Sequence, residues 1–123
     1  MGSTTVKKIK AIEMSHLFTI ICEYKGGTYT KQLRAGNPVQ AFEQWADIFS
    51  NEDCLTLTEK KQFADEIQYS LAGGNLVALE GLQNIWYEGF SLEEDLLEVT
   101  IVGMSEQPIT MPVVEERQSI GYI

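Results

Sequence analysis

The sequence is poor in the side chains that build metal and nucleophilic centres. It contains one histidine, His16, and two cysteines, Cys22 and Cys54. A single histidine excludes a two-histidine metal site and most histidine-rich zinc arrangements. The cysteines lack CxxC spacing, and a disulfide bond between them and a reduced pair are both compatible with the sequence. Reduced thiols are typical of the cytoplasm, and we expect that location.

Basic residues are also scarce. Nine Lys and Arg stand against 18 Asp and Glu, which gives a formal net charge of −9. Nucleic-acid binding depends on Lys and Arg that displace counterions from phosphates, so we expect no nucleic-acid partner. The acidity has two explanations: it keeps the protein in solution, or it attracts a basic partner.

Long hydrophobic runs are absent. No window approaches the roughly 18 apolar residues of a membrane helix, so we expect no membrane partner. The first residues lack the apolar stretch of a secretory signal, and residues 1–5 are expected to be disordered. The apolar fraction of 44% and the charged fraction of 22% are typical of globular domains. We therefore expect residues 1–123 to form a single domain.

Residues 17–49 predict a ββα unit. Residues 17–24 and 28–35 predict two strands, and Gly26-Gly27 predicts a two-residue turn between them. This turn pairs Tyr24 with Tyr29, Cys22 with Lys31, Ile20 with Leu33 and Phe18 with Ala35. These pairs place a mostly apolar set on one side of the hairpin.

Two helices are predicted from capping signals and apolar spacing. Asn37 is the expected N-cap of a helix over residues 39–49, with Pro38 at its first position. An apolar stripe on this helix would cover the apolar side of the hairpin. Thr56 and Glu59 have the spacing of a capping box, which predicts a second helix to about Leu71.

The second half of the chain predicts further strands at residues 84–90 and 96–102. A loop over residues 92–95 pairs Phe90 with Leu97, Glu88 with Val99 and Trp86 with Ile101. Residues 91–95 fit one helical turn and a wide hairpin loop equally well. Residues 76–83 fit a short strand or a loop, and residues 6–13 fit a first strand or an extended arm.

Residues 105–123 predict an extended segment at a sheet edge, or one exchanged between subunits, because Pro108 and Pro112 disfavour helix and interior strands. Together the elements predict an α+β fold. It is a single domain that starts with the ββα unit and has an antiparallel sheet of about four to six strands. Two helices pack on one face of that sheet.

The sequence contains no motif for a catalytic, metal or cofactor site, so we predict none. His16 lies on the same side of its strand as Cys22, but Cys22 fits a buried apolar position better than a nucleophile. Glu88 stands in an apolar strand and is a candidate for a poised acid. The predicted binding residues are Trp86, Glu88, Phe90, Ile109, Met111 and Val113.

Two functional hypotheses follow. The first is a non-enzymatic acidic protein-interaction module, either an inhibitor of a basic partner or a homodimer formed through an edge strand or the C-terminal segment. The second is a small-molecule-binding protein or modest enzyme with a cleft between sheet and helices, for which Glu88, Trp86 and His16 are the candidate residues.

Overall fold

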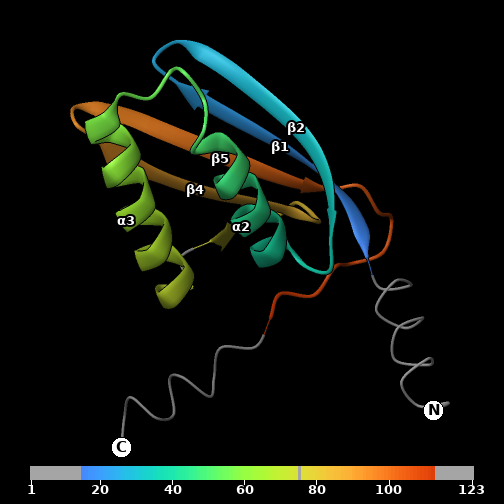
Figure 1. Ribbon diagram of the computed structural model, residues 1–123. Helices are drawn as coiled ribbons and strands as arrows, with labels where there is room; N and C mark the ends of the chain where they lie inside the picture. Colours follow the sequence, from blue (N-terminus) through green and yellow to red (C-terminus); the bar gives the residue numbers. More distant parts are fainter. Residues whose placement is uncertain (1–14, 75, 113–123) are drawn as a thin grey trace, which may run out of the picture.

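The computed structural model describes residues 15–74 and 76–112. Within them, an antiparallel five-stranded sheet carries two helices on one face, which confirms the predicted α+β fold and its initial ββα unit (Figure 1). In chain order the elements are β1 (His16–Tyr24), β2 (Gly27–Ala35), α2 (Pro38–Phe49), α3 (Leu57–Gly73), β3 (Val77–Ala78), β4 (Ile85–Leu92) and β5 (Asp95–Gly103). The predictions for residues 1–5, 6–13 and 113–123 lie outside the described residues.

The strand order is β2-β1-β5-β4-β3. Two local hairpins, β1–β2 and β4–β5, are therefore joined side by side through the antiparallel pairing of β1 with β5. This pairing brings both hairpin turns to the same end of the sheet, where α3 also begins (Figure 1).

The first hairpin turns one residue earlier than predicted. Lys25 and Gly26 form the turn with φ angles of 52° and 78°, and Tyr24 pairs with Gly27. The predicted pairs are therefore wrong by two positions, although the predicted faces survive because side chains alternate with a period of two. Gly27 lies in the strand instead, where an added Cβ would come within 2.9 Å of the Tyr29 hydroxyl.

The second hairpin has the predicted register. Phe90 pairs with Leu97, and Leu92 pairs with Asp95 across a tight turn at Glu93 and Glu94. Neither the single helical turn nor the wide loop forms there. Residues 76–79 contribute the two-residue strand β3, which pairs with β4.

Both helices begin as their capping signals predict. The Asn37 side chain accepts a hydrogen bond from the Gln40 amide at 2.9 Å, and Pro38 opens α2. Thr56 and Glu59 form the complete capping box of α3. Gly74 ends α3 in the left-handed conformation with φ of 67°, which a glycine adopts without steric cost.

The core lies between the helices and one face of the sheet. Trp45 of α2 contacts Phe49 and Phe63, with ring centroids 5.1 and 5.8 Å apart, and Phe63 of α3 contacts Phe90 of β4. Cys22 is fully buried in this core, and its burial raises the thiol pKa to about 12. Cys22 and Cys54 are both free, so the two thiols form no disulfide bond.

The chain after β5 is fastened to the sheet by Asn84. Its side-chain nitrogen donates to the carbonyls of Ser105 and Gln107, at 3.0 and 2.9 Å, and its oxygen accepts from the Ile109 amide at 2.8 Å. Residues 104–112 form no strand, so this described part of the segment does not extend a sheet edge. It turns back below the sheet towards the start of α2 (Figure 1).

Candidate functional site

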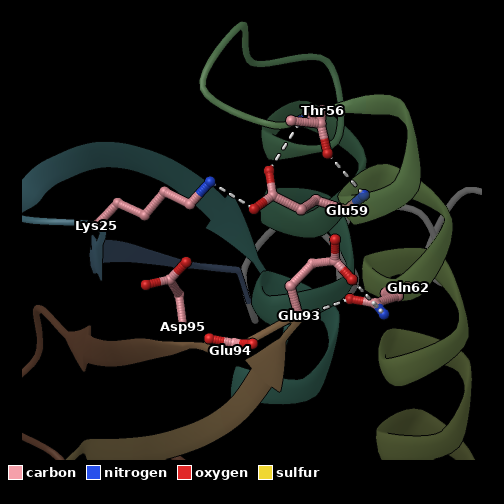
Figure 2. Close-up of a pocket in the computed structure, with 7 residues that line it drawn as sticks. All are labelled: Lys25, Thr56, Glu59, Gln62, Glu93, Glu94 and Asp95. Atoms are coloured by element: carbon pink, nitrogen blue, oxygen red, sulfur yellow. Dashed lines mark hydrogen bonds and ion pairs between the residues drawn. The ribbon is translucent and has the colours of Figure 1, made fainter.

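An open pocket of about 530 Å³ lies at the end of the sheet that carries the two hairpin turns. Its residues come from the β1–β2 turn, the start of α3 and the β4–β5 turn (Figure 2). The lining consists of Lys25, Thr56, Glu59, Gln62, Glu93, Glu94 and Asp95. Four of these seven residues are acidic, so the pocket favours a cationic ligand group.

Glu59 connects the elements that form this pocket, because its carboxylate contacts Tyr24, Lys25 and Thr56. It is buried, and one carboxylate oxygen, Oε2, accepts a hydrogen bond from the Tyr24 hydroxyl at 2.7 Å and pairs with Lys25. The other oxygen, Oε1, accepts from the Thr56 amide at 2.8 Å. The Lys25 ammonium, the Thr56 amide and the Tyr24 hydroxyl together lower the Glu59 pKa to about 2. The carboxylate is thus saturated with partners and holds the first hairpin against α3.

Lys25 is the basic residue of the pocket lining, and it forms an ion pair with Glu59. Its ammonium lies 2.5 Å from Glu59 Oε2, and this contact raises the Lys25 pKa. Figure 2 shows the side chain extended towards Glu59, with Asp95 and Glu94 lying below it. Lys25 therefore compensates the buried carboxylate, and among the described residues it forms no ion pair with the acidic residues of the β4–β5 turn.

The acidic turn between β4 and β5 is held in place by α3. The Glu93 amide donates to Gln62 Oε1 at 2.6 Å, and the Gln62 amide nitrogen donates back to the Glu93 carboxylate at 3.4 Å. Glu93 has a positive φ of 58°, an unfavourable conformation for a residue with a Cβ. A turn fixed in this way loses little conformational freedom when a partner binds.

A second hollow of about 330 Å³ adjoins the first and shares Lys25 with it. Glu23 of β1 and Glu98 of β5 both line it, and they stand directly opposite each other in the antiparallel pairing. Like charges directly opposite each other destabilise a sheet. Glu98 accepts a hydrogen bond from the Tyr87 hydroxyl at 2.8 Å, which orients the carboxylate without neutralising it. We call the surface formed by Glu23, Glu93, Glu94, Asp95 and Glu98 the acidic end.

The predicted binding residues of β4 lie on the covered face of the sheet. Trp86 is buried against Phe18, with ring centroids 6.3 Å apart, and Phe90 is buried against Phe63. Glu88 is buried between them and accepts a hydrogen bond from the Ser70 hydroxyl at 2.8 Å. Desolvation raises the Glu88 pKa, while the Ser70 bond opposes that rise.

The predicted residues of the C-terminal segment are divided. Ile109 is buried, Met111 packs partly against the core, and Val113 lies outside the described residues. His16 and Cys22 lie six residues apart along β1, which separates their Cα atoms by about 20 Å at the usual strand rise. None of these residues that the structure describes lies at the acidic end.

Sequence reasoning did not single out Lys25, Gln62, Glu98 or Ser70 as site residues. The signal for Glu59 was present, because its capping-box spacing was recognisable, but its pairing with Lys25 depends on tertiary packing. The opposition of Glu23 and Glu98 depends on the register of β1 against β5. Neither relation can be read from local spacing.

No protein-family model, curated protein or solved structure matches this chain. Among the described residues, no group of three or more His, Cys, Asp or Glu is arranged to hold a metal ion. In the same part of the chain, neither helix has the length and apolar character needed to cross a membrane.

Proposed function

We propose that the protein is a non-enzymatic acidic interaction module that binds a basic surface of a protein partner through the acidic end. The observation that carries this proposal is the opposition of Glu23 and Glu98. A lysine or arginine of a partner placed across this pair would relieve the repulsion and gain two charge-assisted hydrogen bonds. An unfavourable pair of this kind is expected where function, and not stability, determines the residues.

The surroundings of the pair support the same conclusion. Leu96, between Asp95 and Leu97 on β5, is 55% exposed and lines the same hollow as Glu23 and Glu98. Apolar side chains within a charged rim are typical of protein interfaces. An inhibitor that covers a basic site of its target is the form of interaction that best fits this surface.

The two free thiols support a reducing compartment, and we place the protein in the cytoplasm.

Neutralising the acidic end is expected to weaken salt-sensitive partner binding at least tenfold. The test compares the unmodified protein with a Glu23→Gln/Glu94→Gln/Glu98→Gln variant as baits in lysate of the source organism. Partners retained at low salt should be lost at high salt, because salt screens exposed charges. The variant should bind the recovered partner at least tenfold more weakly, as measured by titration calorimetry with the purified pair.

A matched control is the Glu43→Gln/Asp47→Asn/Glu80→Gln variant, which removes the same charge from exposed positions away from the acidic end. It should bind like the unmodified protein. Equal losses in both variants would show that net charge alone attracts the partner, and the absence of any salt-sensitive partner would contradict the proposal.

The acidic-end variant should also be more stable by about 0.5 kcal/mol, since it removes the opposed charges.

A second copy of the chain is the alternative partner. The observation that favours it is the edge position of β2, which within residues 15–74 and 76–112 pairs with β1 and with no other strand. An unpaired edge accepts a strand from another chain through main-chain hydrogen bonds. A monomeric mass in light scattering at high concentration would exclude this alternative.

A further inference from the structure

A cavity of about 190 Å³ lies far from the acidic end, where the start of α2 meets the end of α3. It is lined by Val39, Phe42, Ser70, Leu71, Gly74, Leu76 and Pro112. An apolar cavity of about 150 Å³ accommodates a benzene molecule. The cavity therefore has room for one aromatic ring or a short aliphatic chain with a small polar group.

Ser70 supplies the single polar side chain of this lining. It is 4% exposed, and its hydroxyl donates to Glu88 Oε1 at 2.8 Å. Because the hydroxyl proton is committed to Glu88, the remaining lone pairs of Ser70 Oγ can only accept a hydrogen bond. A ligand that satisfies this oxygen must carry an N–H or O–H group.

Glu88, which accepts the Ser70 hydrogen bond, determines which donor group of a ligand is most favourable next to Ser70. It is 8% exposed, and among the described residues it forms no ion pair with a basic side chain. The neighbouring charge that acts on it is another acid, Glu66. A buried carboxylate without a cation is unfavourable, so a positively charged ligand group near Ser70 would supply the missing compensation.

We propose that this cavity binds a small apolar amine, whose nitrogen donates to Ser70 Oγ and whose positive charge compensates the Glu88 carboxylate. The apolar body of the amine contacts Val39, Phe42 and Leu76. A carboxylate ligand of the same shape is repelled by Glu88, and a pure hydrocarbon leaves Ser70 Oγ without a donor. The site is independent of the acidic end and of the function proposed for it.

The test uses benzylamine, benzyl alcohol and benzoate, three probes that share a ring and differ in the polar group. Binding is followed by amide chemical shifts in two-dimensional NMR spectra of the complete protein. Benzylamine is expected to give saturable shifts centred on Ser70, Leu71 and Leu76. Benzyl alcohol should bind at least threefold more weakly than benzylamine, and benzoate at least tenfold more weakly.

Two variants separate the charge from the cavity. Glu88→Gln retains an acceptor for Ser70 and should weaken benzylamine at least tenfold while leaving benzyl alcohol nearly unchanged. Leu76→Phe fills the cavity and should prevent binding of all three probes. The exposed Glu43→Gln variant serves as the charge control and should bind benzylamine normally, and the dispersion of each spectrum confirms that the variant is folded.

Three results would overturn the proposal. One is benzoate binding as tightly as benzylamine, and another is Glu88→Gln binding benzylamine with unchanged affinity. The third is the absence of saturable shifts around the cavity with every probe.

Discussion

Replacing Glu59 with alanine is expected to lower the free energy of unfolding by about 3 kcal/mol, the largest loss expected from any charged residue in the described structure. The substitution leaves the buried Tyr24 hydroxyl without its acceptor and removes the side chain that caps the Thr56 amide. It also separates the β1–β2 turn from α3. Chemical denaturation measures the loss, and the midpoint of thermal unfolding should fall by about 10 °C or more.

Two further variants identify the origin of the loss. Glu59→Gln keeps an acceptor for Tyr24 and should retain part of the stability, whereas Glu43→Ala on the exposed face of α2 should change it by less than about 0.5 kcal/mol. A Glu59→Ala protein as stable as Glu43→Ala would show that the network at the start of α3 is dispensable.

The same residue should dominate the acid side of the stability profile. The folded-state pKa of Glu59 is lowered from 4.5 to about 2. Its contribution to stability is therefore complete above pH 4.5 and is lost as the pH falls towards 2. Glu88, whose pKa is raised, acts in the opposite direction, because it favours the folded state more when protonated. Unfolding free energies measured between pH 5 and pH 2 should fall less steeply in Glu59→Gln than in the unmodified protein.

Replacing Asn84 with alanine is the second substitution expected to have a large effect, a loss of about 3 kcal/mol. The change removes three hydrogen bonds to the segment after β5. It also places a Cβ-bearing residue without a compensating side-chain bond at a φ of 63°. Limited proteolysis should cut the Asn84→Ala protein between residues 104 and 112 before the sheet is attacked.

Asn84→Gly is the informative comparison, because glycine tolerates the positive φ but forms none of the side-chain bonds. It should recover the part of the loss due to backbone strain and show the same early proteolysis. If Asn84→Ala is cut no faster than the unmodified protein, packing of Ile109 against Gly103 holds the segment without the asparagine.

The sequence predicted the elements of this fold well, because their signals are local. Asn37 with Pro38, and Thr56 with Glu59, mark the two helix starts at the observed residues. The error in the first hairpin arose where two adjacent glycines allowed two turns. Lys25 occupies the turn in spite of its Cβ, and its ammonium reaches Glu59 on another element. The observed turn at Lys25 and Gly26 thus coincides with the tertiary contact between Lys25 and Glu59, which local turn preferences do not include.

The candidate site was less predictable from the sequence, because its residues meet only through tertiary contacts. Glu88 was recognised as an unusual acid within an apolar strand, but its partner Ser70 lies 18 positions away on a helix. Glu23 and Glu98 belong to strands that pair only after both hairpins have formed. The acidic end therefore forms only when the sheet is assembled. The amino-acid composition predicted the excess of negative charge but not where it gathers.

The pairing of β1 with β5 also has a consequence for how the molecule folds. It joins residues more than 70 positions apart, whereas each hairpin closes through a turn of a few residues. The hairpins can form within microseconds, but the central pairing must first overcome the entropy of closing a long loop. Until that step is complete, β1 and β5 both present free edges. The rate of this one closure therefore sets how long a newly made chain is exposed to pairing with the wrong strand.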